Sequence, residues 1–233
     1  MTHYHVISDI HGCYAAFDGA LQDWNQSDTL VLLGDYVDRG PDSKAVVDRV
    51  RELDQQPNVV VLRGNHDVAF ARWVIDGDHQ YYYQPGFKET LISYMGPKRF
   101  KKSTRRQRGE YMKYNHLSDM RWLAGRPKYH ETDHMIFTHA GINLNIPDWR
   151  DDTRSMDIIR EPFYRSSKQA EKTVVFGHTP TPFLHDNEDN LNIWESENLD
   201  KIGIDGGISM GGVLHAVRFA NDGHIVGHKV YRN

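Results

Sequence analysis

The sequence is almost without cysteine. The one cysteine, Cys13, cannot form an intrachain disulfide, and one thiolate is too few for the cages of cysteine that hold structural zinc. No apolar run approaches the roughly 18–20 residues needed to cross a bilayer, and the first residues lack the basic-then-apolar pattern of a signal peptide. These absences predict a cytoplasmic protein without membrane association.

An excess of positive charge is also missing. Lys and Arg number 28 against 32 Asp and Glu, which gives a net charge of −4 and predicts no nucleic-acid polymer as partner. The length of 233 residues suits a single domain spanning 1–233. Histidine, in contrast, is abundant at 14 residues and is the commonest metal ligand, so the positions of the histidines need attention.

Short apolar runs alternate with helical patterns in the first 67 residues and return later. We expect strands at His5–Ile7, Leu30–Leu33, Val59–Leu62, Met135–Phe137 and Thr173–Phe176. The spacing of Tyr14, Phe17, Leu21 and Trp24 predicts a helix after the first strand, and Ser43 is expected to cap a second helix. Strands that alternate with helices indicate βαβ units, and therefore a parallel sheet in an α/β fold.

Two further regions have a different pattern. The segment 71–128 lacks clear strands, and we expect a cap insertion of helices and loops; its run Tyr81-Tyr82-Tyr83 favours packing within the cap over nucleobase stacking. Near the C-terminus, 213–219 and 224–231 flank the turn Ala220-Asn221-Asp222-Gly223. This antiparallel hairpin suggests a second sheet packed on the first.

The cap segment also carries a dense basic run. Its cations are Lys98, Arg99, Lys101, Lys102, Arg105, Arg106 and Arg108. Such a run is usually a solvated face. Against an acidic chain it could instead guide a polyphosphate or an acidic phosphopeptide to the site.

Each of the five expected strands runs into a polar block. The blocks are Asp9-Ile10-His11-Gly12, Gly34-Asp35-Tyr36-Val37-Asp38-Arg39-Gly40, Gly64-Asn65-His66-Asp67, His139-Ala140-Gly141 and Gly177-His178. In open α/β sheets the carboxyl ends of the strands form the ligand site. Taken singly, these residues also suit turns, polar loops or core histidines, but five strand ends together favour one functional site.

Oxygen and nitrogen donors without sulfur suit manganese, iron or zinc. Two such ions, ~3.5–4 Å apart, clamp a phosphate and activate water. A pair of this kind needs a shared carboxylate, and Asp35 is the natural bridge.

The order of the blocks resembles the phosphoprotein phosphatase branch of the calcineurin-like metallophosphoesterases: D-x-H-G, G-D-x-x-D-R-G, G-N-H-[ED], a histidine before A-G, and then G-H. A further block, 203–207, also resembles that family. The resemblance implies a four-layer αββα sandwich of two mixed sheets, with two divalent metal ions, manganese first and iron or zinc as alternatives, at the carboxyl ends of the strands.

The resemblance also implies roles for individual residues. The first metal would be held by Asp9, His11 and Asp35, and the second by Asp35, Asn65, His139 and His178. Arg39 and Arg160 would bind the substrate phosphate, although Arg160 also fits a helix surface. His66 would protonate the leaving oxygen, with Asp38 orienting it. Asp67 stands where many protein phosphatases carry glutamate, at a position without a ligand role.

The resemblance implies a serine/threonine protein phosphatase that hydrolyses phosphate esters by direct attack of metal-bound hydroxide. The alternative is a symmetrical bis(5'-nucleosyl)-tetraphosphatase, so the expected substrate is a phosphoprotein or a dinucleoside polyphosphate. A non-catalytic binding module is a third hypothesis, against which the complete set of ligand positions argues.

Overall fold

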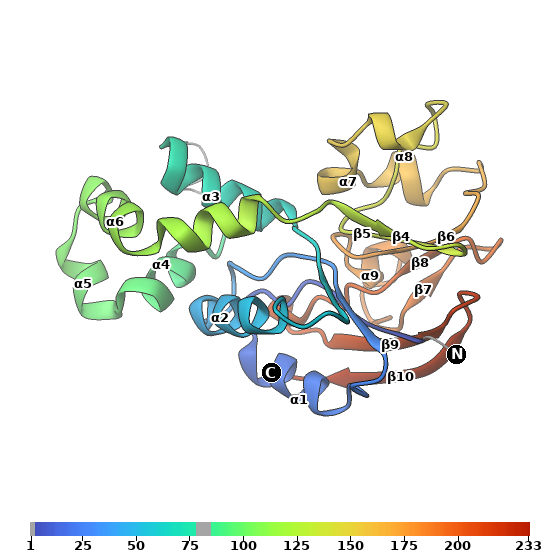
Figure 1. The fold of residues 1–233 in the computed structure, drawn as a ribbon, viewed down its shortest axis with the longest axis horizontal. Helices are drawn as coiled ribbons and strands as arrows, with labels where there is room; N and C mark the ends of the chain where they lie inside the picture. Colours follow the sequence, from blue (N-terminus) through green and yellow to red (C-terminus); the bar gives the residue numbers. More distant parts are fainter. Residues whose placement is uncertain (1–2, 78–84) are drawn as a thin grey trace.

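The computed structural model describes residues 3–77 and 85–233 (Figure 1). The tyrosine run 81–83 lies outside them. The strands are β1 (His3–Ile7), β2 (Thr29–Leu32), β3 (Val59–Val61), β4 (Tyr129–Glu131), β5 (Met135–Thr138), β6 (Thr173–Phe176), β7 (Trp194–Glu195), β8 (Lys201–Gly203), β9 (Leu214–Ala220) and β10 (Ile225–Tyr231). The helices are α1 (Tyr14–Gln22), α2 (Ser43–Leu53), α3 (Asn65–Asp76), α4 (Phe87–Met95), α5 (Pro97–Lys102), α6 (Arg105–Ala124), α7 (Ser155–Ile158), α8 (Glu161–Tyr164) and α9 (Thr181–Leu184), with short 3-10 turns at Trp149–Asp151 and Ile208–Met210.

The strands form two five-stranded mixed sheets. The first has the order β10-β9-β1-β2-β3, in which β1, β2 and β3 are parallel and β9 is antiparallel to both of its neighbours. The second has the order β4-β5-β6-β8-β7, with β5, β6 and β8 parallel and the two edge strands antiparallel. The expected strands are confirmed, because every apolar run predicted from the sequence falls on one of these strands.

Three hydrophobic cores separate four layers. Successive side chains of a strand point to opposite faces of its sheet. Leu30 and Leu32 therefore pack with α1 and α2 in one outer core, while Val31 and Leu33 pack between the sheets. On the second sheet, Ile136 enters the other outer core, under α7 and α8. The inner strands are buried on both faces, which explains their continuous apolar runs. The predicted αββα sandwich of two mixed sheets is confirmed.

Two details of the prediction were wrong. The C-terminal hairpin does form, but β9 pairs with β1, so it extends the first sheet and does not build the second. Ser43 does not cap α2, because Asp42 occupies the N-cap position. The Ser43 side chain is fully buried, and its hydroxyl lies 3.2 Å from the hydroxyl of Thr90 in α4.

Helices α3 to α6 form a lobe at one side of the sheets (Figure 1). Helix α3 packs along α6, and α4 contacts α2. Phe70, Phe87 and Met120 of this lobe belong to the same hydrophobic core as α1 and α2, so the lobe is packed onto the first sheet's outer layer. The helical content expected for the middle segment is therefore present.

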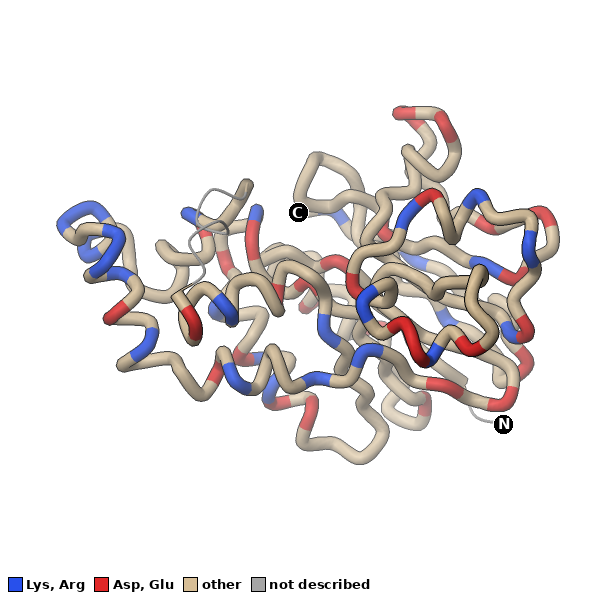
Figure 2. The backbone as a smooth tube through the Cα atoms, turned by 90° about the horizontal axis from the view of Figure 1, so that it is seen from above, with Lys and Arg blue, Asp and Glu red and all other residues tan. Residues whose placement is uncertain are grey.

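The basic run lies at the end of this lobe that is far from the sheets (Figure 2). Its side chains make local contacts there. The guanidinium of Arg108 lies 3.7 Å from the ring centre of Phe100, and Nε of Arg106 pairs with Glu110 at 2.8 Å. This placement favours the solvated-face interpretation over substrate guidance.

Within the described part of the chain, no helix combines the length and the apolar character that a membrane span requires.

Candidate active site

Loops that follow the parallel strands of both sheets meet at one edge of the sandwich. Backbone hydrogen bonds hold the first two loops together: Asp9 N–H donates to Gly34 O at 3.2 Å, and His11 N–H donates to Asp35 O at 2.8 Å. In the second sheet the N–H of Gly177 donates to His139 O at 2.8 Å. The predicted blocks are therefore brought together, as the position of the site at the carboxyl ends of the strands requires.

Two glycines allow the loops after β2 and β3 to touch. A Cβ on Gly34 would lie 2.2 Å from the nitrogen of Gly64. A Cβ on Gly64 would lie 2.0 Å from Oδ1 of Asp35. Neither position can accept a side chain, so the close approach that places Asp35 against the β3 loop depends on both glycines.

Positive φ angles are concentrated at this edge. Among the described residues, eight other than glycine have positive φ, and six of them belong to the predicted site: Asp9, His11, Asp35, Asp38, Arg39 and His178. Such conformations cost about 1–3 kcal/mol each and persist only where the surrounding structure enforces them. The fold therefore bears local strain in order to aim these side chains.

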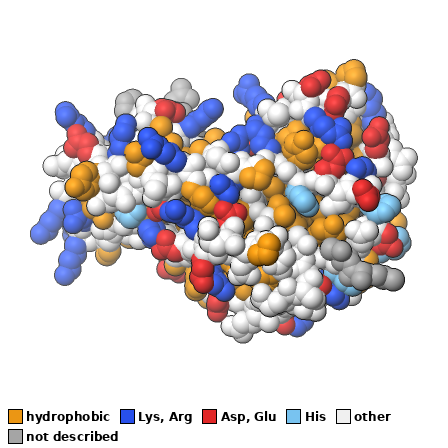
Figure 3. Space-filling view, in the orientation of Figure 1, with side chains coloured by type: hydrophobic (Ala, Val, Ile, Leu, Met, Phe, Trp, Pro, Cys, Tyr) orange, Lys and Arg blue, Asp and Glu red, His pale blue; other side chains and the backbone are white. Residues whose placement is uncertain are grey.

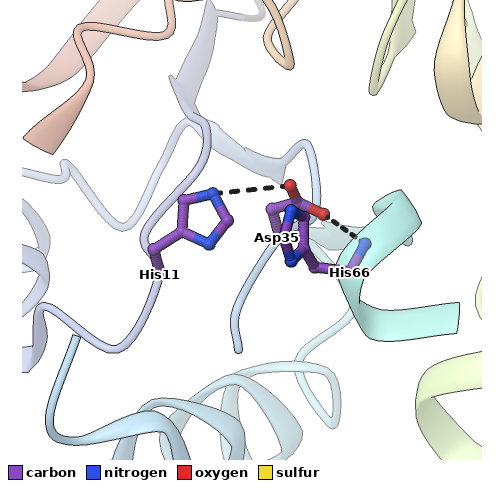
Figure 4. Close-up of side chains that lie close together, drawn as sticks. All are labelled: His11, Asp35 and His66. Carbon is purple, nitrogen blue, oxygen red and sulfur yellow. Dashed lines mark hydrogen bonds and ion pairs between the residues drawn. The ribbon is translucent and has the colours of Figure 1, made fainter. Parts of the chain in front are cut away.

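Two groups of buried side chains have the arrangement of a metal site. One comprises His11, Asp35 and His66, and the other Asp35, His139 and His178, with one donor atom per residue and all atoms of a group within 4.8 Å of one another. Asp35 belongs to both groups, as the prediction of a bridging carboxylate requires. Figure 4 shows Asp35 between His11 and the start of α3, with Oδ2 of Asp35 3.5 Å from Nε2 of His11.

The orientation of the imidazole rings suits a metal. Nδ1 of His11 donates to Val37 O at 2.8 Å, and Nδ1 of His139 donates to Leu33 O at 3.1 Å, so Nε2 of each ring faces the site. Burial lowers the pKa of His11 to about 3 and that of His178 to about 2. Rings that stay neutral can offer a lone pair to a cation.

Asp9 and Asn65 complete the predicted ligand set. Asp9 lies outside both groups of donors, and its carboxylate accepts hydrogen bonds from Ser8 Oγ and from the N–H of His178 at 3.0 Å. Asn65, the first residue of α3, is half-buried, and its Oδ1 lies 3.0 Å from Nε2 of His139. Both side chains are thus at the site.

The charges of the site fit a bound cation. Asp9, Asp35 and Asp205 are all nearly inaccessible to solvent. Burial, strengthened by the neighbouring acids, raises the pKa of Asp9 and of Asp205. Burial would also raise the pKa of Asp35, but the surrounding histidines outweigh it and lower this pKa. A cluster of buried carboxylates is costly unless positive charge offsets it, and divalent metal ions at the two groups would do so.

His66, a member of the first donor group, also contacts Asp38 and Arg39. Its Nδ1 donates to Oδ2 of Asp38 at 2.7 Å, and its Nε2 lies 3.4 Å from a guanidinium nitrogen of Arg39. Burial would lower the pKa of His66, but Asp35 and Asp38 outweigh it and raise this pKa to about 9. A raised pKa and a fixed Nδ1 favour the protonated ring, which is the form that a proton donor needs.

Arg160 lies beside Thr179 and His178. It is an exposed residue that precedes α8, and its guanidinium donates to Oγ1 of Thr179 at 3.4 Å. Its charge contributes to the low pKa of the neighbouring His178. Arg39 and Arg160 therefore flank the histidines from two different loops, as expected for a pair of phosphate-binding groups.

Three buried residues beside the site were missed by sequence reasoning. Asp67 accepts backbone hydrogen bonds from Asp35, Tyr36 and Gly64 at 2.8–2.9 Å and so fixes the loop that carries Asp35. The sequence shows that Asp67 follows His66, but it does not show which backbone groups Asp67 binds. Asp205 follows β8 in the glycine-rich block 203–207, a signal to which no role was attached.

The third missed residue is Thr90 in α4. Its hydroxyl accepts a hydrogen bond from the N–H of Asp38 and donates one to Oδ1 of Asp38, both at 2.8 Å. No sequence signal marks it, because it lies 52 residues from its partner. The helical lobe thus contributes to the site through a buried threonine.

Comparisons with known proteins agree on the family. A family model described as calcineurin-like phosphoesterase matches residues 2–228. The symmetrical bis(5'-nucleosyl)-tetraphosphatase of Wigglesworthia glossinidia brevipalpis is 27% identical over 211 residues, which cover 87% of this chain and 64% of that protein. A protein of the same name from Buchnera aphidicola subsp. Schizaphis graminum is 30% identical over 154 residues, which cover 64% of this chain and 47% of that protein. The chain thus spans less than two thirds of the length of these relatives.

Solved structures support the fold. A crystal structure of a protein provisionally assigned as a diadenosine tetraphosphatase has a TM-score of 0.64 and 22% identity, and covers 99% of this chain and 94% of its own. A protein serine/threonine phosphatase from Saccharomyces cerevisiae has a TM-score of 0.60 and 13% identity, with coverage of 100% and 80%. The matched family model, the shared fold and the converging polar blocks lead to one conclusion: this chain belongs to the calcineurin-like phosphoesterase family.

Proposed function

We propose that the chain is a metal-dependent hydrolase that cleaves dinucleoside tetraphosphates symmetrically into two nucleoside diphosphates. The observation that supports hydrolase activity is the position of Asp35, which belongs to both donor groups and accepts a hydrogen bond from the N–H of His66. The substrate is inferred from relatives such as the two described above, which are named symmetrical bis(5'-nucleosyl)-tetraphosphatases. They favour this alternative over the protein phosphatase expected first.

In this proposal the metals would be held by the residues predicted from the sequence. Asp9, His11 and Asp35 would hold one ion, and Asp35, Asn65, His139 and His178 the other. Two divalent ions, which we propose to be manganese, would supply Lewis-acid activation of the phosphate and of the attacking water. Nitrogen and oxygen donors without sulfur suit that metal.

The remaining chemistry falls to side chains of the chain itself. Arg39 and Arg160 would bind oxygens of the reacting phosphate, because a planar guanidinium matches them with two parallel hydrogen bonds. As the water oxygen bonds to phosphorus, the anhydride bond to the departing nucleoside diphosphate breaks. His66 would donate its Nε2 proton to that departing oxygen, and Asp38 would hold the ring in place through Nδ1.

The test is a parallel assay on metal-stripped protein to which manganese has been restored. Diadenosine tetraphosphate should yield ADP as the only nucleotide product. The kcat/KM for a phosphoserine peptide should be at least tenfold lower, which corresponds to a difference of about 1.4 kcal/mol in transition-state stabilisation. ATP with AMP as products would exclude symmetrical cleavage. Faster hydrolysis of the peptide would return the protein-phosphatase alternative to first place.

A further inference from the structure

A cleft opens beside Asn65, between α3 and the segment around α7. Its volume is about 600 Å³, within the roughly 300–1,000 Å³ of small-ligand sites. In Figure 3 the outline of the molecule is notched between the α3–α6 lobe and the rest, and blue side chains border the notch. The charged residues that line the cleft are Arg63, Arg72, Lys128, Arg154 and Asp157.

Two of the four cations lie close together and share one acid. Arg63 and Lys128 are on neighbouring segments, because the N–H of Arg63 donates to Pro127 O at 3.1 Å. Nζ of Lys128 lies 2.9 Å from Oδ2 of Asp157, and Nε of Arg63 lies 3.6 Å from Oδ1 of the same residue. One carboxylate therefore serves two cations, and this part of the cleft keeps a positive charge.

The other two cations are Arg72 and Arg154. Arg72 follows Asn65 by seven residues, so it lies on the same face of α3 and about 10 Å further along it. Arg154 directly precedes α7 on the facing side. Both residues are exposed, and neither has a carboxylate partner among residues 3–77 and 85–233. Their guanidinium groups are available to an anion in the cleft.

The cleft adjoins the predicted metal ligands at Asn65. This residue lines the cleft and also contacts His139 at 3.0 Å. An anion that extends from the proposed metal site into the cleft therefore enters a space lined by four cations. Four cations against one carboxylate, in a chain whose net charge is −4, form a local field that attracts a compact polyanion.

We propose that this cleft binds a chain of phosphate groups that extends from the metal centre, namely the phosphates of the departing half of a dinucleoside tetraphosphate. This inference rests on the proposed function and adds the residues that select the substrate, with Arg72 and Arg154 as its specificity-determining residues. Arginine suits the role because its planar fork pairs with phosphate oxygens. An acidic phosphopeptide would spread its charges along an extended backbone, which the compact cluster of cations fits less well.

The experiment compares the wild type with the double variant Arg72→Gln/Arg154→Gln. The control is Arg106→Gln, another exposed helical arginine, in the distant basic run. Inorganic tripolyphosphate and inorganic phosphate are used as competitive inhibitors of p-nitrophenyl phosphate hydrolysis by the full chain with excess manganese. Calorimetry measures the dissociation constants of the same two anions directly.

Tripolyphosphate should bind the wild type at least tenfold more tightly than phosphate does. The double variant should lose most of this ratio of dissociation constants, because each charged hydrogen bond that is removed weakens binding by about tenfold. The control should keep the ratio. Equal ratios in the wild type and the double variant, or an equal loss in Arg106→Gln, would overturn the proposal. The same calorimetry with an acidic phosphoserine peptide tests the other substrate class: weaker binding of that peptide alone in the double variant would overturn the proposal and assign the cleft to peptides. The calorimetric ratio does not depend on cleavage, so wild type that produces no ADP refutes the proposed function but leaves this test intact.

Discussion

Nδ1 of His66 lies 2.7 Å from Oδ2 of Asp38, and this pair joins the first turn of α3 to the loop after β2. Asp38 is itself held by Thr90, so three elements distant in the sequence fix one imidazole ring. The other ring nitrogen, Nε2, is left facing Arg39 and the metal-ligand candidates. The fold therefore fixes the position of the ring that we propose as the proton donor.

Substitution of His66 tests that role. His66→Ala should lower kcat for phenyl phosphate by roughly 10²–10⁴-fold, the usual size of general-acid catalysis. The loss should be smaller for p-nitrophenyl phosphate, whose leaving group needs little protonation. Bound metal, measured by elemental analysis, should stay unchanged, and His224→Gln at an exposed histidine is the matched control. Loss of a metal ion in His66→Ala would show that the residue is a ligand, as its place in a donor group with His11 and Asp35 allows.

The hydroxyl of Thr90 should act through His66. Thr90→Val keeps the shape of the side chain but removes both hydrogen bonds to Asp38. We expect kcat for phenyl phosphate to fall about tenfold, the value of one buried hydrogen bond, and the pH profile of kcat to shift with it. Thr90→Ser should restore both. If Thr90→Val lowers only the thermal stability and leaves the pH profile in place, the residue has a packing role alone.

Asp35 should control both metals together. The wild type loaded with manganese should contain about two ions per chain. Asp35→Asn removes the charge common to both donor groups, so occupancy should fall below one ion and activity should be lost. Asp48→Asn, at an exposed acid of α2, serves as the control and should keep both ions. An Asp35→Asn protein that retains one tightly bound ion would show that the two sites are independent.

Asp67 should matter for the loop that carries Asp35. Its two oxygens accept three backbone hydrogen bonds, and an amide can accept through only one of them. Asp67→Asn should therefore lower the free energy of unfolding of metal-free protein by about 1–3 kcal/mol, the cost of buried donors without acceptors. Manganese affinity should also decline. Asp67→Glu keeps both oxygens and should lose less; equal losses in urea titrations of the two variants would point to packing instead.

A buried histidine outside the site should make the stability depend on pH. His215 is almost inaccessible; its Nε2 donates to Leu191 O at 2.8 Å, and its Nδ1 lies 2.9 Å from Nε2 of His228. Burial, helped by His228, lowers the pKa of His215 to about 4, below the 6.5 of an unfolded chain. As the pH falls, the unfolded state binds the proton first. The free energy of unfolding is therefore unaffected by this histidine above pH 6.5 and decreases between about pH 6.5 and pH 4.

Between pH 7.5 and pH 5, the titration of His215 should lower the free energy of unfolding by about 2 kcal/mol. Urea denaturation of metal-free wild type and His215→Gln at the two pH values measures the effect, because other titrating groups contribute equally to both proteins. The stability loss should be smaller in the variant by about that amount. Equal losses in the two proteins would mean that His215 is protonated in the folded state.

The sequence by itself determined the elements and the identity of the site. Apolar runs such as Leu30–Leu33 predict strands buried on both faces, because successive side chains of a strand point to opposite faces and every side chain of the run is apolar. Each run ends in a block that contains carboxylates, an amide or imidazoles, and parallel strands place such blocks at one edge. Asp35, His66 and His139 were therefore predictable as partners.

Only the tertiary structure decided how those parts are joined. The pairing of β9 with β1 rather than with a second sheet depends on the register between strands more than 200 residues apart, which local patterns do not encode. Thr90 bonds to the N–H and the carboxylate of Asp38 across 52 residues, and Asp67 bonds across 31–32 residues to backbone N–H groups of the kind that every residue except proline possesses. The cleft of Arg72 and Arg154 likewise joins two helices whose cations look like ordinary surface charges in the sequence. Side-chain type and spacing specify local structure and chemistry. A hydrogen bond between distant residues, or the net charge that lines a cleft, arises only when distant segments of the chain pack together.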